Sequence, residues 1–169
     1  MRTILAAVVL VCAGGLAAAQ EAKYESKEGR FRAKFPGKDE PKLTEAKADG
    51  MPLKIYMVEK DKKVAFAVIH SDLSADAAKA EPKVLLEGGE KGLVDNFKAK
   101  VTKSGEVKFS SNGKDYPARE IVAEKEDLHL RVTIILAGNR LYQVFVAGPK
   151  DLVAGKEADE FLKSFELTK

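Results

Sequence analysis

The stretch from Glu106 to Val146, EVKFSSNGKDYPAREIVAEKEDLHLRVTIILAGNRLYQVFV, decides the fold. Its turn signals, Asn112-Gly113 and Gly138-Asn139, favour antiparallel hairpins, because glycine and asparagine tolerate the positive φ of tight turns. Between them, Leu128–Leu136 alternates apolar and polar residues, as a strand does when one face packs on a core and the other is polar. We therefore predict four successive antiparallel strands, at residues 106–110, 116–124, 128–136 and 140–146.

The N-terminal half shows the same organisation. Residues 24–26 and 30–35 flank a turn at Lys27-Glu28-Gly29, and residues 42–48 and 53–59 flank Asp49-Gly50, a further hairpin signal. The run Val64–Ile69 is apolar at every position, which is typical of a strand covered on both faces. We expect this strand to lie in the centre of the sheet.

A long helix is predicted after Pro82, which suits the first turn of a helix. Its apolar residues fall on one stripe at helical spacing: Leu86, Leu93, Val94, Phe97 and Val101. Three glycines at 88, 89 and 92 predict either a close approach to the sheet or a frayed first half. Glu90 falls on the same stripe, so we expect its carboxylate either to reach solvent or to pair with an arginine across the sheet.

A second helix is predicted over residues 155–164, where four apolar residues share one stripe: Ala158, Phe161, Leu162 and Phe165. Strands joined by tight turns, with two helices at long intervals, indicate an α+β fold. We predict a mostly antiparallel sheet with helices packed on it.

The first 19 residues have the features of a secretory signal peptide. A basic residue at position 2 and an apolar run from Ile4 to Val11 precede the cleavage signal Ala17-Ala18-Ala19. Cleavage near Ala19 leaves a single domain over residues 20–169, periplasmic or extracellular, without a stable transmembrane segment. The cysteine Cys12 is removed with the signal, so the mature domain is cysteine-free. Lipidation of Cys12 is not expected, because Val11 stands where the bacterial motif has Gly, Ala or Ser.

The sequence offers little support for catalysis, metal binding or nucleic-acid binding. His70 and Asp72 are two residues apart and share a strand face, but a metal site needs further ligands, and no zinc-binding motif occurs. The nucleophile motif G-x-S-x-G does not occur, and the glycines at 88–92 lack the spacing of a P-loop. Lysines are spread evenly among acidic residues, whereas nucleic-acid binding favours clusters. We therefore expect no cofactor and no nucleic-acid partner.

A small set of arginine and tyrosine residues is a candidate interaction patch: Arg119, Glu120, Arg140 and Tyr142. Interfaces favour arginine and tyrosine. The structural alternative is that Arg119 and Glu120 form cross-strand ion pairs and that Tyr142 caps the core. A second candidate site is a small-molecule pocket between the long helix and the sheet, near Glu90 and His129.

Four segments in order carry a family resemblance: Gly29–Gly37 (GRFRAKFPG), Tyr116–Glu120 (YPARE), Arg140–Pro149 (RLYQVFVAGP) and Phe161–Phe165 (FLKSF). They resemble exported bacterial proteins of unassigned role, similar in layout to the superfamily of PsbP, the extrinsic photosystem II subunit, and the Mog nuclear import factor. The resemblance covers roughly residues 24–167. It implies an α/β/α sandwich around an antiparallel sheet, and a binding or assembly role without assigned metal ligands.

These observations favour a secreted or periplasmic, non-catalytic binding or assembly module, whose partner is an envelope protein. The alternative is a small-ligand carrier or weakly specific hydrolase that uses the pocket near Glu90 and His129. A purely structural envelope component is a third hypothesis. The sequence does not define the oligomeric state.

Overall fold

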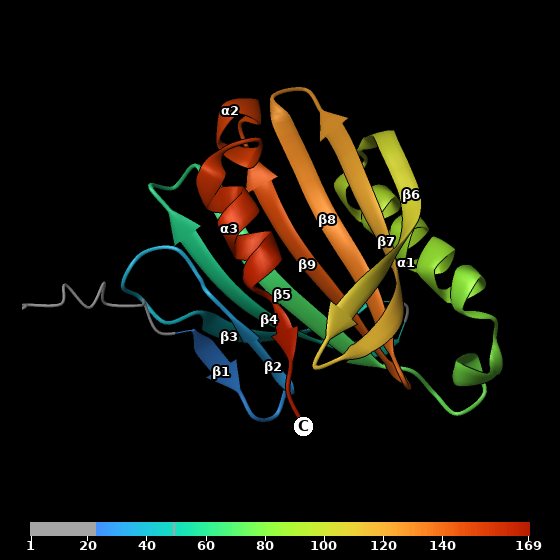
Figure 1. The fold of residues 1–169 in the computed structure, drawn as a ribbon. Coiled ribbons are helices and arrows are strands. Elements are labelled where there is room, and N and C mark those ends of the chain that lie inside the picture. Colours follow the sequence, from blue (N-terminus) through green and yellow to red (C-terminus); the bar gives the residue numbers. More distant parts are fainter. Residues whose placement is uncertain (1–22, 49) are drawn as a thin grey trace, which may run out of the picture.

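The computed structural model describes residues 23–48 and 50–169 (Figure 1). The predicted signal peptide therefore lies outside the described residues, as does Asp49 of the predicted Asp49-Gly50 turn. The larger of two sheets has seven antiparallel strands in the order β3-β4-β5-β9-β8-β7-β6. Its strands are β3 (Lys42–Ala48), β4 (Met51–Lys60), β5 (Val64–Asp72), β6 (Lys100–Ser111), β7 (Lys114–Lys125), β8 (Leu128–Ala137) and β9 (Arg140–Gly148).

The predicted hairpins are confirmed by this topology. At the β6–β7 turn Asn112 has φ 51° and Gly113 has φ 73°, the positive values that a tight hairpin turn requires. The β8–β9 turn contains Gly138 at φ 66°. The apolar run Val64–Ile69 lies in β5, which pairs with β4 on one side and β9 on the other, so it is an interior strand as predicted.

One face of the large sheet is covered by both ends of the described chain. β1 (Tyr24–Ser26), β2 (Phe31–Ala33) and β10 (Glu166–Leu167) form a three-stranded sheet in which the C-terminal strand pairs with β2. The helices α2 (Lys150–Val153) and α3 (Lys156–Ser164) lie on the same face (Figure 1). Their shared core includes large, fully buried side chains of several elements: Phe31, Phe66, Val144, Val146 and Phe161.

The opposite face is covered by α1 (Pro82–Phe97), which follows the short 3-10 helix η1 (Ala77–Lys79). A second core joins α1 to the sheet through Leu86, Leu93, Ile121, Leu130 and Ile134. A Cβ atom at Gly89 would lie 3.2 Å from Ile134 Cδ1, so this glycine marks the close approach of helix and sheet. The predicted α+β class, with helices on both faces of an antiparallel sheet, is confirmed.

Two local predictions are wrong at the end of α1. The apolar stripe was predicted to continue to Val101, but the helix ends at Phe97, because Lys98 adopts the left-handed conformation with φ 51°. Val101 therefore belongs to β6, which begins at Lys100, six residues earlier than predicted. A β-bulge between Val101 and Lys103 shifts the register at this end of the strand.

The second side of β8 is less polar than its sequence predicts. Leu130, Val132 and Ile134 face α1, as expected, and His129, Arg131 and Thr133 face the other side. On that other side Ile135 is 1% exposed, because it packs in the core beneath α3. Both faces of β8 are therefore partly covered.

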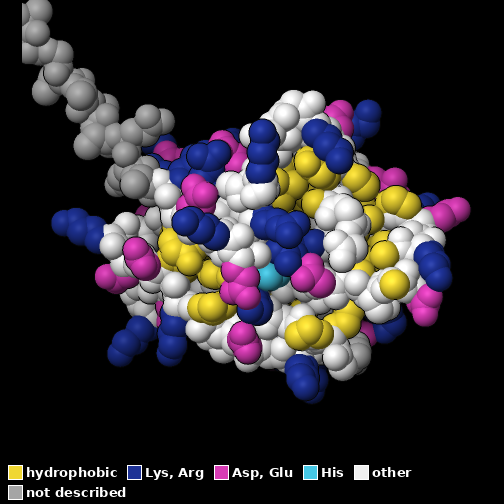
Figure 2. Space-filling view, turned by 90° about the horizontal axis from the view of Figure 1, so that it is seen from below, with side chains coloured by type: hydrophobic (Ala, Val, Ile, Leu, Met, Phe, Trp, Pro, Cys, Tyr) yellow, Lys and Arg dark blue, Asp and Glu magenta, His cyan; other side chains and the backbone are white. Residues whose placement is uncertain are grey.

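The surface at the lower end of the molecule intersperses acidic and basic side chains with smaller apolar patches (Figure 2). This pattern agrees with the nearly balanced composition of 29 Lys+Arg and 26 Asp+Glu.

Candidate functional site

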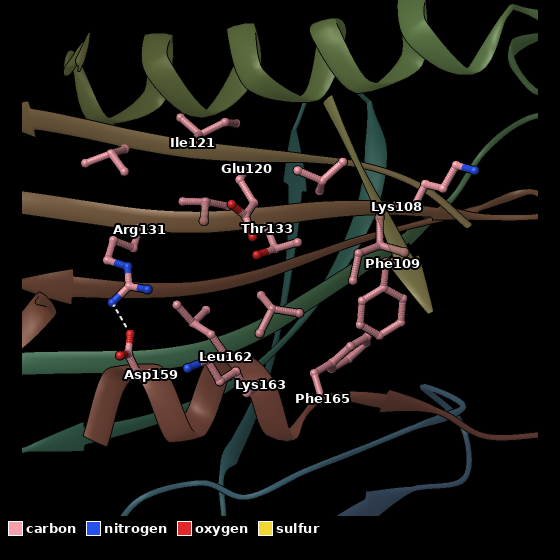
Figure 3. A pocket seen from close by; sticks show the side chains of 15 residues that line it. Lys108, Phe109, Glu120, Ile121, Arg131, Thr133, Asp159, Leu162, Lys163 and Phe165 are labelled. Carbon is pink, nitrogen blue, oxygen red and sulfur yellow. Dashed lines mark hydrogen bonds and ion pairs between the residues drawn. The ribbon is translucent and has the colours of Figure 1, made fainter. Parts of the chain in front are cut away.

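A groove lies between α3 and the strands β6, β7 and β8 (Figure 3). It forms where α3 leaves part of the sheet face uncovered. Its volume is about 260 Å³. The residues that line it are Val107, Lys108, Phe109, Glu120, Ile121, Val122, Arg131, Val132, Thr133, Ile135, Val144, Asp159, Leu162, Lys163 and Phe165.

The groove is apolar where the end of β6 meets the end of α3. Phe109 and Leu162 are half-buried and pack against the core beneath them. The Phe109 ring lies 5.6 Å from the Phe165 ring, centroid to centroid, which fixes the end of β6 against the end of α3. The groove therefore has a preformed apolar surface at this end.

An ion pair closes one end of the groove. Arg131 Nη1 donates hydrogen bonds to Asp159 Oδ1 at 2.6 Å and to the carbonyl of Val153 at 3.1 Å (Figure 3). The hydrogen bond from Arg131 holds the pKa of the Asp159 carboxyl below its usual value. This arginine therefore ties both α2 and α3 to β8, which is a structural role.

The edge strand β6 borders more than this groove. Val107 lines the groove and also lines two neighbouring surface hollows, one beside Tyr116 and Pro117 and one beside the start of α1 at Pro82. β6 stands at the end of the strand order, so only one of its sides is paired, with β7. The middle of β6 is thus an unpaired strand edge with concave surface on both sides of the sheet.

The charged groups along this edge are mostly lysine. Glu106 lies 3.9 Å from Lys83, a pair between β6 and α1. Lys103 and Lys108 are exposed, and within the described residues neither has a carboxylate within 4.0 Å. The exposed edge therefore carries uncompensated positive charge.

The four residues of the predicted interaction patch do not form one surface. Arg119 faces α1, where its Nε donates to Glu90 Oε2, and Ser104 Oγ donates to the same oxygen at 3.0 Å. Glu120 follows on the opposite face of β7 and lines the groove. Of the two alternatives predicted for Glu90, the structure contains the ion pair with an arginine, which joins α1 to β7.

Arg140 and Tyr142 lie together at the lower end of β9. Arg140 forms a bidentate ion pair with Asp72, in which Nε donates to Oδ1 at 2.6 Å and Nη2 donates to Oδ2 at 2.8 Å. These hydrogen bonds lower the pKa of the Asp72 carboxyl. The Tyr142 hydroxyl donates to the carbonyl of Gly29 at 2.8 Å, and its side chain is 2% exposed. Tyr142 therefore caps the core, as the structural alternative predicted.

Glu90 and His129 are not brought together. Glu90 is on α1, whereas His129 lies on the opposite face of β8, with its Nδ1 3.8 Å from Glu124 Oε2. A pocket shared by these two side chains is therefore not formed, since the sheet separates them.

His70 is the other histidine of the sequence analysis. It is 4% exposed, stacks on Tyr56 with ring centroids 5.9 Å apart, and its Nε2 has no hydrogen-bond partner in the described part of the chain. Burial lowers its pKa to about 4, and the charge of Arg140 acts in the same direction. Asp72 is paired with Arg140. Residues 23–48 and 50–169 contain no group of three or more His, Cys, Asp or Glu side chains that could hold a metal ion.

The fold and the groove define an α+β sandwich with an open surface site rather than an enclosed cavity. No family model matches the chain, and no curated protein matches it. The chain is similar to the solution structure of cyanobacterial PsbP, CyanoP, from Synechocystis sp. PCC 6803, with 13% identity and a TM-score of 0.57. The match covers 91% of this chain and 96% of that chain. The chain therefore has a PsbP-like fold, which confirms the predicted resemblance at the level of fold.

No helix among residues 23–48 and 50–169 is both long and apolar enough to span a membrane.

Proposed function

We propose that this protein is an exported, non-catalytic binding module that takes up an extended segment of an envelope protein along β6. The observation that carries the proposal is the position of the groove beside an unpaired strand edge. An extended segment can add to such an edge through main-chain hydrogen bonds, while alternate side chains enter pockets on the sheet face.

The size of the groove favours a protein segment over a small ligand. Pockets that enclose small molecules usually measure about 300–1,000 Å³. The groove measures about 260 Å³ and is open to solvent, so it suits one or two apolar side chains of a larger partner.

The charge of the edge defines the chemistry of the partner segment. Lys103 and Lys108 repel other basic strands and discourage indiscriminate pairing. An extended segment with acidic side chains near these lysines, and an apolar side chain in the groove beside Phe109 and Leu162, complements the surface.

The test is site-specific photo-cross-linking in the cell envelope of the source organism. A photoreactive amino acid replaces Lys108 on the β6 edge, and a matched control replaces Lys125, which is exposed at the far end of the adjacent β7. The expected result is one protein captured from position 108 and not from 125, with the cross-link mapped to an acidic, apolar segment. The charge reversal Lys103→Glu, made in the protein that carries the photoreactive residue at position 108, should strongly reduce capture. Equal capture from both positions, or cross-links to folded surfaces only, would overturn the proposal.

Export rests on the N-terminal sequence and has its own test. Cell fractionation followed by N-terminal sequencing should find the protein outside the cytoplasm and starting near Gln20. Recovery of the intact N-terminus in the cytoplasm would contradict this part of the proposal.

A further inference from the structure

Turns from both halves of the chain meet at the lower end of the molecule (Figure 1), and a second concavity, separate from the groove, lies among them. The β1–β2 turn, the β6–β7 hairpin, the β8–β9 turn and the residues around β10 all reach it. Its volume is about 330 Å³. The residues that line it are Arg30, Asp72, Lys114, Tyr116, Ala137, Gly138, Asn139, Arg140, Tyr142, Leu167 and Thr168.

Long-range hydrogen bonds hold these segments in place. The backbone N–H of Thr168 donates to the carbonyl of Arg30 at 2.9 Å, which joins the C-terminal segment to the β1–β2 turn. Asn112 Nδ2 donates to the carbonyl of Leu167 at 2.6 Å, which joins the β6–β7 turn to the same segment. Because its walls are tied to one another, the pocket is preformed, and little ordering is needed on binding.

The positive charges around the pocket are unequally compensated. The three guanidinium nitrogens of Arg140 are all engaged, two with Asp72 and the third with the carbonyl of Glu28 at 2.8 Å. Arg30 and Lys114 also line the pocket, and among the described residues neither has a carboxylate within 4.0 Å. Counting Asp72 against the three cations leaves two uncompensated positive charges.

Arg30 and Lys114, the two cations without a carboxylate partner, are each constrained by the structure, Lys114 in its side chain and Arg30 in its backbone. The Lys114 Nζ atom lies 5.1 Å from the centroid of the Tyr116 ring, a cation–π contact that orients the ammonium at the pocket. Arg30 has φ 52°, a left-handed conformation that is costly for a residue other than glycine and is often retained at functional sites. A glycine would satisfy the backbone of this turn at lower cost, so the arginine side chain is the feature that needs explaining.

We propose that this pocket binds a small, multiply charged oxyanion bearing carboxylate or phosphate groups, held between Arg30 and Lys114. Guanidinium and ammonium groups form charge-assisted hydrogen bonds with both kinds of oxyanion. Asn139, Tyr116 and Thr168 add neutral polar groups to the lining, which also includes the engaged pair of Arg140 and Asp72. The inference is independent of the proposed function, because the groove uses β6, α3 and a different set of charges.

The test is an NMR titration of the purified protein with inorganic phosphate and, separately, with citrate, at constant ionic strength. The expected result is saturable shifts of the backbone amides of Arg30, Gly138 and Asn139 with at least one probe. The stronger probe indicates whether phosphate or carboxylate is preferred. No saturation with either probe overturns the proposal.

Matched variants separate a defined site from general attraction to lysines. Arg30→Gly suits the left-handed backbone and removes the cation, and Lys114→Gln removes the second; each should weaken binding about tenfold. Lys125→Gln removes a cation from the opposite end of the same strand as Lys114 and should leave the affinity unchanged. Lys114→Arg should retain most of the binding. Equal weakening by all lysine variants would indicate nonspecific attraction and overturn the proposal.

Discussion

Replacing Arg119 with alanine should destabilise the protein without touching either candidate binding surface. The Arg119 guanidinium donates to Glu90, and the two side chains are 16% and 15% exposed, so the pair lies between α1 and β7 largely out of contact with water. Without the arginine, the hydrogen bond from Ser104 at 3.0 Å is the one that Glu90 retains among the described residues. A carboxylate left in this position without its counter-charge raises the free energy of the folded state.

The exposed fraction of the two side chains determines how much the substitution should lower the free energy of unfolding. Removing one partner of a fully buried ion pair costs about 3–5 kcal/mol, and an exposed pair contributes about 0–1 kcal/mol. With roughly one-sixth of each side chain still exposed, we expect Arg119→Ala to lower the free energy of unfolding by about 2 kcal/mol. For a domain of this size the melting temperature should fall by about 4–8 °C.

The assay is urea unfolding at neutral pH, with a double-mutant cycle through Glu90→Ala. The double variant should be more stable than the sum of the single changes predicts, by about 1 kcal/mol or more, because the two side chains interact directly. Lys79→Ala is the control, since Lys79 and Asp76 form a pair at 2.8 Å whose side chains are 75% and 92% exposed. If Arg119→Ala behaves like this control, or if the cycle is additive, the reasoning about the buried pair is refuted.

Two further predictions concern a glycine and a buried histidine. Gly148→Ala should destabilise the protein by about 1–3 kcal/mol, because the new Cβ would lie 2.7 Å from the backbone oxygen of Lys63. Gly105→Ala, which meets nothing within 4 Å, should change the melting temperature little, and equal shifts for the two would contradict the steric argument. The lowered pKa of His70, about 4 against 6.5, means that the unfolded chain binds more protons between these values. The free energy of unfolding should therefore fall as the pH drops from 6.5 toward 4, and His70→Phe should flatten this part of the profile. An NMR titration that places the His70 midpoint near 6.5 would contradict this prediction.

The sequence predicted most of the sheet because its strands carry local signals. Asn112-Gly113 requires a tight turn, and the alternation over Leu128–Leu136 requires a strand, so neither depends on distant parts of the chain. The end of α1 was mispredicted because Val101 continues the helical stripe by chance, while Lys98 ends the helix in a conformation that lysine seldom adopts.

The candidate sites were harder to predict because they depend on which side of the sheet each side chain occupies. Arg119 and Glu120 are neighbours in sequence, yet the period of two along β7 places them on opposite faces. The groove also depends on where α3 lies across β6, β7 and β8, which precede it in the sequence. No local sequence pattern specifies that placement, although the apolar residue Leu162 correctly indicated that this helix packs on the sheet.

The two edges of the large sheet both carry lysines, and they differ in the surface that adjoins them. On the β3 side, Glu45 lies 3.4 Å from Lys54 of the neighbouring β4, whereas Lys42 and Lys47 have no carboxylate within 4.0 Å among the described residues. On the β6 side, Lys103 and Lys108 lack such partners in the described chain, and concave surface adjoins the middle of the strand. Lysines at either edge attract an acidic segment and repel a basic one, and the hollows beside β6 add apolar contact for the side chains of a bound segment. The proposed complex between β6 and an acidic segment should therefore weaken at high salt, because exposed charges are screened over about 10 Å at 0.1 M ionic strength.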